Sequence, residues 1–128
     1  MPGREDFQYA ILRVVPDVER GESLNAGVVL FCRRLAFLGA RTGLDEAALA
    51  ALAPDCDPVA VRAHLEALER VAAGAAGGGP IADLEPSERF HWLTAPASTI
   101  VQASPVHTGL TSDPAAELEH LFERLVRR

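Results

Sequence analysis

The sequence predicts an α+β fold in which a small antiparallel sheet of about four strands packs against two to four helices. Three observations predict this class. Strand-like patterns occupy the first third of the chain, helical patterns with capping residues follow, and one further strand pattern lies between the helices. The chain has 128 residues and shows neither an internal repeat nor a second domain, so we expect one domain over 1–128.

Three strands are expected at the start of the chain. Residues 7–15 alternate between two faces, which is the period of a strand. Residues 26–33 are almost continuously apolar, as in a central strand covered on both faces. Residues 35–41 form the third candidate, and a short hairpin at Arg33 and Arg34 would join it to the second. Together the three segments predict an antiparallel meander.

Two helices are expected in the middle of the chain. Residues 44–53 are rich in Ala and Leu, and Pro54 ends this pattern because proline cannot continue a helix. Asp57 is a suitable N-cap for the next helix, and Gly74 is a suitable end. The glycine-rich residues 74–80 then form a flexible connector, since they lack the Gly-Lys-Ser/Thr ending of a phosphate-binding loop.

The last third of the chain combines a strand with two helices. Residues 87–93 can begin a short helix, and residues 98–104 alternate again, which predicts a fourth strand with a polar face. Asp113 and Pro114 repeat the cap-and-proline start of the earlier helix. The helix after them has one apolar face at the spacing i, i+3, i+4 and i+7, formed by Leu118, Leu121, Phe122 and Leu125.

Composition excludes several classes of chemistry. The net charge of −6, from 12 basic and 18 acidic residues, argues against general nucleic-acid binding, which depends on clustered cations. Every basic residue is Arg, so Schiff-base and P-loop lysine chemistry are excluded. Cys32 and Cys56 lie far apart without a C-x-x-C partner, so no zinc site is predicted. We expect neither a metal nor an organic cofactor.

The chain carries no signal for export or membrane insertion. Its longest apolar runs reach about five to seven residues, against ~20 for a membrane-spanning helix. The first residues are polar and lead directly into a strand pattern, so no secretory segment is predicted. We therefore expect a cytoplasmic protein with no membrane partner.

A first cluster of candidate binding residues surrounds the polar loop 16–25, which is longer than a tight hairpin requires. Paired carboxylates beside Arg can bind a metal, position a phosphate, or form a solvated rim of ion pairs. An Arg on an apolar strand face must reach solvent or meet an acid, so Glu19 and Glu22 are expected partners of Arg13. The cluster consists of Arg13, Asp17, Glu19, Arg20, Glu22 and Asn25.

A second cluster lies in the last third of the chain and consists of Arg89, His91, Ser104, His107 and Thr108. A Ser–His pair can supply a nucleophile and a base, yet the spacing matches no G-x-S-x-G or H-E-x-x-H motif. His91 is also explained as a packing residue, and the polar groups of 104–109 as turn and cap bonds. No catalytic residue is assigned.

Three segments in order are similar to the signature stretches of a bacterial family catalogued as domain of unknown function 3037. They are residues 9–32, the Glu-Arg-Phe-His-Trp-Leu of 88–93 and the Ser-Pro-Val-His-Thr-Gly of 104–109. The resemblance implies a small bacterial cytoplasmic protein without assigned activity or cofactor. Such proteins are often encoded beside a HipA-like kinase, which implies an accessory or regulatory role.

Two functions from different classes remain open. The first is a non-enzymatic binding or accessory module whose partner is a HipA-like kinase. The alternative is a small hydrolase or nucleotide-processing enzyme that uses Arg, His and Glu residues of 13–25 and 89–108. This alternative predicts that Arg13, Glu19, Arg89, His91 and His107 meet in one pocket. A homodimer formed through the sheet edge or the C-terminal helix is compatible with either function.

Overall fold

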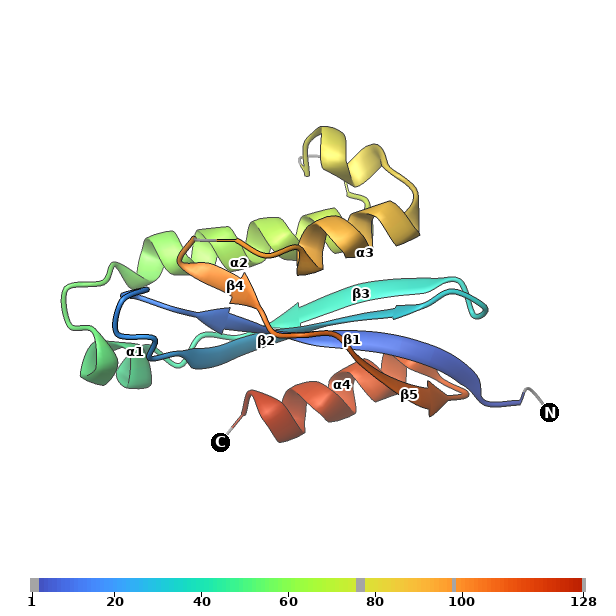
Figure 1. Cartoon of the computed structure of the whole chain (residues 1–128), viewed down its shortest axis with the longest axis horizontal. Helices are drawn as coiled ribbons and strands as arrows, with labels where there is room; N and C mark the ends of the chain where they lie inside the picture. Colours follow the sequence, from blue (N-terminus) through green and yellow to red (C-terminus); the bar gives the residue numbers. More distant parts are fainter. Residues whose placement is uncertain (1–2, 76–77, 98, 128) are drawn as a thin grey trace.

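The computed structural model describes residues 3–75, 78–97 and 99–127. It contains one five-stranded antiparallel sheet with helices on both faces (Figure 1). The strands are β1 (Glu5–Val14), β2 (Leu24–Cys32), β3 (Phe37–Thr42), β4 (Val101–Ala103) and β5 (His107–Thr111). The helices are α1 (Glu46–Leu52), α2 (Pro58–Ala73), the 3₁₀ turn η1 (Pro80–Asp83), α3 (Pro86–Thr94) and α4 (Pro114–Leu125). The α+β prediction is confirmed.

Strand β1 lies in the middle of the sheet. It pairs with β2 on one side and with both β4 and β5 on the other, while β3 pairs with β2. The predicted antiparallel meander of the first three strands is therefore confirmed. The neighbouring strand on the other side is interrupted, because β4 pairs with residues 12–14 of β1 and β5 pairs with residues 5–9.

The sequence predicted one strand at 98–104 and a turn after it, and this assignment is wrong in its bounds. Strand β4 begins at Val101, Ser98 lies outside the described residues, and the segment assigned to a turn contains β5. The interruption between the two strands is at Ser104 and Pro105. Proline has no N–H for a strand ladder, and the Ser104 side chain replaces the missing pairing, as described below.

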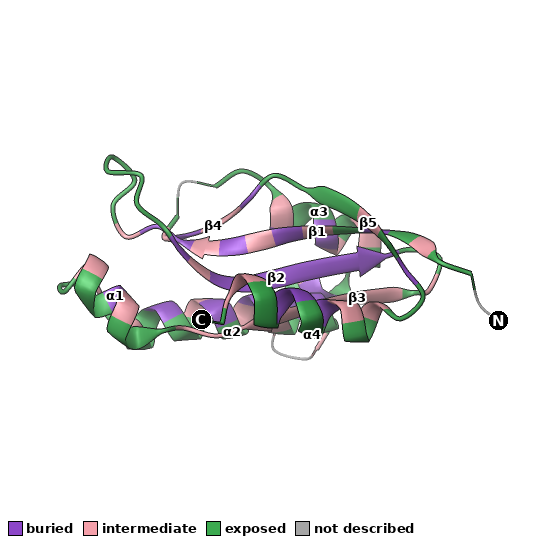
Figure 2. Cartoon of the chain, turned by 90° about the horizontal axis from the view of Figure 1, so that it is seen from below, coloured by how far each residue is buried: buried purple, intermediate pink, exposed green. Residues whose placement is uncertain are grey.

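Helices cover the two faces of the sheet unequally. Helices α2 and α3 pack on one face, and α4 packs on the other against β2 and β3 (Figure 1). Figure 2 views the sheet from the side of α4 and shows no helix in front of β1, β4 and β5; α3 lies behind them. Residues 26–32 of β2 are all buried, which confirms the predicted central strand. Cys32 is one of these buried residues.

The predicted helix caps are confirmed. The Asp57 side chain accepts a hydrogen bond from the backbone N–H of Val59, and the Asp113 side chain accepts one from that of Ala116. Helix α2 ends at Gly74, whose φ of 67° lies in the left-handed region that glycine adopts at low cost. These caps set where α2 begins and ends and where α4 begins.

Candidate functional site

The shape of loop 16–25 comes from local backbone bonds. The Asp17 side chain accepts a hydrogen bond of 3.0 Å from the N–H of Glu19. The N–H of Gly21 donates to the Asp17 carbonyl at 3.1 Å, and Gly21 has a φ of 73°. Such an Asx turn followed by a left-handed glycine closes a turn without a ligand. Asp17 therefore serves the conformation of the loop, and Glu19 is exposed.

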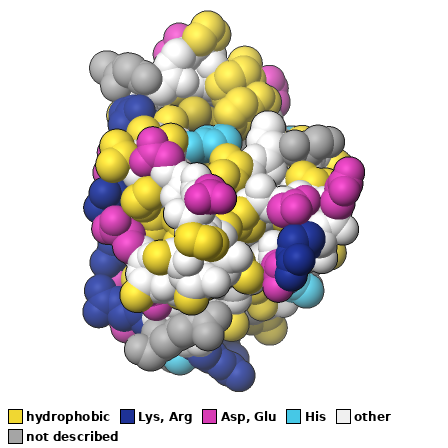
Figure 3. All heavy atoms as spheres, turned by 90° about the vertical axis from the view of Figure 1, so that its left-hand side faces the viewer, with side chains coloured by type: hydrophobic (Ala, Val, Ile, Leu, Met, Phe, Trp, Pro, Cys, Tyr) yellow, Lys and Arg dark blue, Asp and Glu magenta, His cyan; other side chains and the backbone are white. Residues whose placement is uncertain are grey.

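Arg20 and Glu22 pair with each other at 2.5 Å on the surface. The hydrogen bond and the charge of Arg20 lower the pKa of the Glu22 carboxyl, and Glu22 raises the pKa of Arg20. A carboxyl with a lowered pKa is a poor general acid. Figure 3 views the end of the molecule that carries this loop, where acidic, basic and apolar side chains are interspersed. Of the three roles predicted for the charges of loop 16–25, the Arg20–Glu22 pair fits the solvated rim of ion pairs.

Arg13 is half-buried on β1, opposite Asn25 of β2 and Gln102 of β4. Its expected pairing with Glu19 or Glu22 does not form, and no other ion pair reaches Arg13 among the described residues. Asn25 has a structural role, because its Nδ2 donates to the carbonyl of Leu125 at 3.0 Å. The amide thereby satisfies an unpaired carbonyl at the end of α4.

Arg89 holds the end of α2 in place. Its Nη1 donates to the carbonyls of Val71 and Ala72 at 3.1 and 2.8 Å, and its Nε donates to that of Leu84 at 3.0 Å. Carbonyls in the last turn of a helix lack partners in that helix and attract cations. Arg89 therefore joins α2 to α3 and has few donors left for an anion.

Ser104 is also a structural residue, with only 3% of its surface exposed. Its Oγ accepts a hydrogen bond of 2.8 Å from the N–H of Ile11 and donates to the carbonyl of Pro105. Its own N–H donates to the Ile11 carbonyl. Because this hydroxyl both accepts and donates a hydrogen bond to the backbone, its proton is not directed to a histidine base, as a serine nucleophile requires.

The histidines of the second cluster lie on opposite faces of the sheet. His107 is opposite Tyr9 in the β1–β5 pair, and their ring centroids are 5.3 Å apart on the α4 face. The next residue, Thr108, points to the other face, where it shares a groove with His91 of α3. The alternative hypothesis predicts that Arg13, Glu19, Arg89, His91 and His107 meet in one pocket. This convergence is wrong, because Arg89, His91 and His107 are directed to three different places.

The groove shared by His91 and Thr108 lies between α3, β5 and the β2–β3 turn, with a volume of about 580 Å³. We call it the α3–β5 groove. The aromatic rings of Phe31 and Phe90, 5.4 Å apart, form its apolar part. Its remaining polar lining consists of residues outside the two predicted clusters, namely Asp6, Gln8, Arg33, Arg34 and Ser87. The Arg33–Arg34 pair is visible in the sequence, where it predicts only a hairpin.

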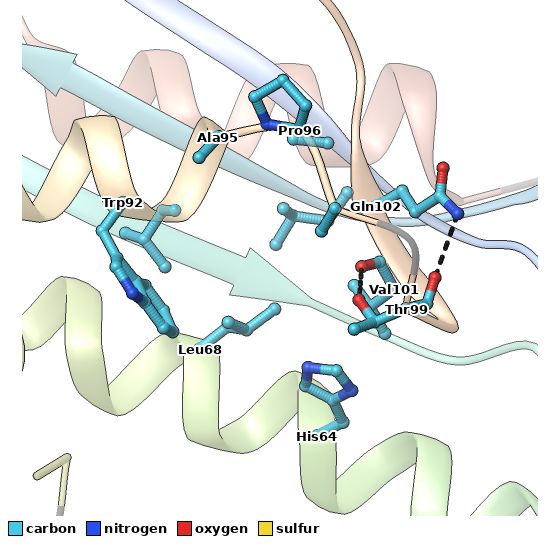
Figure 4. Close-up of a pocket in the computed structure, with 12 residues that line it drawn as sticks. His64, Leu68, Trp92, Ala95, Pro96, Thr99, Val101 and Gln102 are labelled. Carbon is cyan, nitrogen blue, oxygen red and sulfur yellow. Dashed lines mark hydrogen bonds between the residues drawn. The ribbon is translucent and has the colours of Figure 1, made fainter.

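A second hollow, of about 270 Å³, lies between α2, α3 and β4 (Figure 4). We call it the Trp92 hollow. Leu68 and Val101 supply apolar walls, and His64, Thr99 and Gln102 supply polar edges. Trp92, the only Trp of the chain, lines one side of the hollow, and 46% of its surface is exposed. The sequence does not mark Trp92 as exposed, because the exposure of an aromatic ring is decided by packing.

Other kinds of site receive no support from the geometry. No group of three or more His, Cys, Asp or Glu side chains in residues 3–75, 78–97 and 99–127 is arranged to hold a metal ion. None of the helices in these same residues is long and apolar enough to cross a membrane.

The fold, together with the α3–β5 groove and the Trp92 hollow, defines a small α+β protein with an open antiparallel sheet and concave surfaces next to α3. The family model described as Protein of unknown function (DUF3037) matches residues 9–126. The chain therefore belongs to this family. Neither the curated proteins nor the solved structures contain a match to it.

Proposed function

We propose that the protein is a non-enzymatic binding module, an accessory protein in a bacterial cytoplasmic system, and that a partner protein inserts an apolar side chain into the Trp92 hollow. One observation carries the proposal. Trp92 is nearly half exposed beside a hollow with apolar walls and a few polar edges. Trp residues are enriched among the side chains that carry most of the binding energy of protein interfaces.

The dimensions of the hollow favour a side chain over a free metabolite. Its volume of about 270 Å³ is below the usual 300–1,000 Å³ range of small-molecule sites, yet it is large enough for one Leu, Met or Phe side chain. Thr99 and Gln102 already use polar groups on local carbonyls, since Thr99 Oγ1 donates to Val101 and Gln102 Nε2 donates to Thr99. Few fixed polar groups remain to recognise a polar small molecule.

The resemblance to proteins encoded beside a HipA-like kinase makes such a kinase the first partner to test. An acidic module of net charge −6 is suited to a basic surface on its partner. The alternative of a hydrolase or nucleotide-processing enzyme gains no support, because Arg89 is engaged by carbonyls and the two histidines face opposite sides of the sheet.

The single Trp allows a direct test. The chain is labelled with 5-fluorotryptophan, which gives one fluorine resonance, and the unlabelled kinase is added at micromolar concentration. We expect this resonance to shift and broaden as the complex forms, because the ring moves from a half-exposed to a buried environment. Absence of a complex, with both proteins folded, would contradict the proposed partner.

Two variants show whether the hollow itself is the binding surface. Trp92→Ala is expected to weaken the complex by roughly thirtyfold or more, the usual loss for a central anchor residue. Val59→Ala is the matched control, since Val59 is an apolar residue of α2 with 63% of its surface exposed and does not line the hollow. A complex that both variants weaken equally would exclude the Trp92 hollow as the site.

A further inference from the structure

The two edge strands of the sheet differ in how they are protected. At β3, the backbone N–H and the hydroxyl of Thr42 both donate to the Glu69 carboxylate of α2. Arg41 of the same strand pairs with Glu119 of α4 at 3.3 Å, so helices on both faces reach this edge. Charged side chains and covering helices are the usual means of preventing strand addition.

Strand β5, at the opposite edge, lacks these means of protection. Its sequence, His107-Thr-Gly-Leu-Thr111, contains no Asp, Glu, Arg or Pro. Within the described residues it pairs only with β1, and Figure 2 shows no helix against its outer side. Leu110 has 56% of its surface exposed. An uncharged, uncovered edge strand is a surface for pairing with a further strand.

The hydrogen-bond pattern of β1 identifies the outward backbone groups of β5. Ile11 exchanges hydrogen bonds with Ser104, and the N–H of Val15 donates to Ile100, so odd-numbered residues of β1 face this side. Tyr9 and Phe7 therefore form the hydrogen-bonded pairs with His107 and Gly109. By alternation, the N–H and C=O groups of Thr108 and Leu110 point out of the sheet.

This pattern is self-complementary. When a second copy of β5 is placed antiparallel with full overlap of 107–111, Gly109 faces its own copy at the two-fold axis. Thr108 then faces Leu110 of the second copy, and these are the residues with outward N–H and C=O groups. The register with the longest overlap is thus the one that forms two hydrogen-bonded pairs, each with two main-chain hydrogen bonds. One extended sheet would run through both copies.

The side chains also match in this register. Thr108 and Leu110 are on the α3 face, and Thr108 lines the α3–β5 groove. Leu110 of the second copy would lie beside Thr108, at the mouth of a groove whose apolar part is formed by Phe31 and Phe90. Leu110 and the groove residue Thr108 lie on either side of Gly109. The two-fold axis at Gly109 therefore places Leu110 of each copy beside Thr108 of the other.

Charges across the axis are compatible with pairing. On the α4 face, the row that contains Tyr9 and His107 continues with Thr111 and then Glu5 of the second copy. An imidazole and a carboxylate of opposite copies therefore lie in one row, and no carboxylate of one β5 meets a carboxylate of the other. On the α3 face, Asp6 of β1 lies opposite Leu110, and this row continues with Thr108 and then Gln8 of the second copy. No acidic residue of one copy is therefore directly opposite an acidic residue of the other.

We propose that the protein forms a two-fold symmetric dimer by antiparallel pairing of β5 with β5 of a second copy, with Leu110 of each copy covering the α3–β5 groove of the other. This surface is separate from the Trp92 hollow, so the dimer does not depend on the proposed function. The groove is then an interface between copies rather than a substrate site.

The test measures mass and backbone protection in the full chain. Sedimentation equilibrium is expected to give about twice the 13.6 kDa of one chain. Leu110→Glu places a charge opposite Thr108 of the second copy, next to the two-fold axis, and Thr108→Pro removes an outward N–H at a position where the monomer does not use it. Each is expected to weaken the association by roughly tenfold or more, whereas Val59→Glu, the same kind of change on exposed α2, leaves the mass unchanged.

Amide hydrogen exchange followed by NMR then reports the register. In the dimer, the amides of Thr108 and Leu110 are expected to exchange slowly, and in Leu110→Glu they exchange as solvent-facing amides do. A monomer in sedimentation overturns the proposal. A dimer in which these two amides remain unprotected, or which persists in both edge variants, also overturns it because the copies would then associate through another surface.

Discussion

Removal of the Arg89 side chain tests the claim that this residue supports the fold and does not bind an anion. In Arg89→Ala, the carbonyls of Val71, Ala72 and Leu84 lose the guanidinium that bridges them. The carbonyl of Val71 keeps a hydrogen bond from the N–H of Gly74. The main loss therefore falls on Ala72 at the end of α2 and on the link from α2 to α3.

The size of the effect follows from these contacts. A hydrogen bond to a charged group contributes about 1.5–3 kcal/mol when partly buried, and a cation at a helix C-terminus adds about 0.3–1 kcal/mol. The bond to Ala72 is partly buried, whereas the bond to Leu84 is exposed and contributes little. We expect Arg89→Ala to lower the free energy of unfolding by about 2–3 kcal/mol. This is a large part of the about 5–15 kcal/mol typical of such proteins.

Urea denaturation, followed by far-UV circular dichroism and by Trp92 fluorescence, measures this loss. Arg89→Lys is expected to lose about half as much, because a single ammonium group cannot bridge carbonyls on two elements as the planar guanidinium does. Amide exchange near Gly74 should also increase in Arg89→Ala, because the last turn of α2 is no longer held.

Arg62→Ala is the matched control, since Arg62 is a half-exposed Arg whose Nη1 pairs with Glu46 at 2.9 Å. Its loss is expected to stay below about 0.5 kcal/mol, as for other surface ion pairs. If Arg89→Ala costs no more than Arg62→Ala, with equal denaturant slopes, the helix-end role of Arg89 is refuted.

Three further predictions concern residues of the two clusters. Ser104→Ala leaves the partly buried N–H of Ile11 without its acceptor, so urea denaturation should show a loss of about 1–3 kcal/mol, whereas Ser104→Thr should retain part of the bond. Asn25→Ala releases the last carbonyl of α4 and should cost about 0.5–1.5 kcal/mol; no increase in amide exchange there would contradict the capping role. The pKa of Glu22 is lowered in the folded chain, so its pairing stabilises the fold above the pKa of an unpaired Glu and is lost as pH falls through the lowered value. NMR titration should show this lowered midpoint, and Arg20→Ala should return it to the ordinary range.

Much of the fold could be predicted because its signals are local. The alternation of 7–15, the apolar run of 26–33 and the caps at Asp57 and Asp113 each depend on neighbours in sequence. Strand β5 could not be predicted in this way. Its pairing with β1 joins segments about a hundred residues apart, and its His-Thr-Gly-Leu-Thr sequence is equally typical of a turn.

The candidate site was predicted less well, for a related physical reason. Charge and hydroxyl groups can be read from the sequence, but the atoms that satisfy them cannot. Arg89 and Ser104 looked available for ligands, and tertiary packing directs them to backbone carbonyls and an N–H. Conversely, no binding role was predicted for Arg33 or Trp92, and packing leaves Arg33 at the α3–β5 groove and Trp92 at the Trp92 hollow.

The sequence by itself determined the class of fold, the order of most elements and the absence of lysine chemistry, because composition and periodicity act over a few residues. Only the tertiary structure decided which polar groups remain free, since long-range contacts either use a donor or leave it at the surface. It also decided the uneven cover of the sheet: α4 protects β2 and β3, while β5 keeps an open edge. That open edge results from the path of the whole chain, which no local pattern specifies.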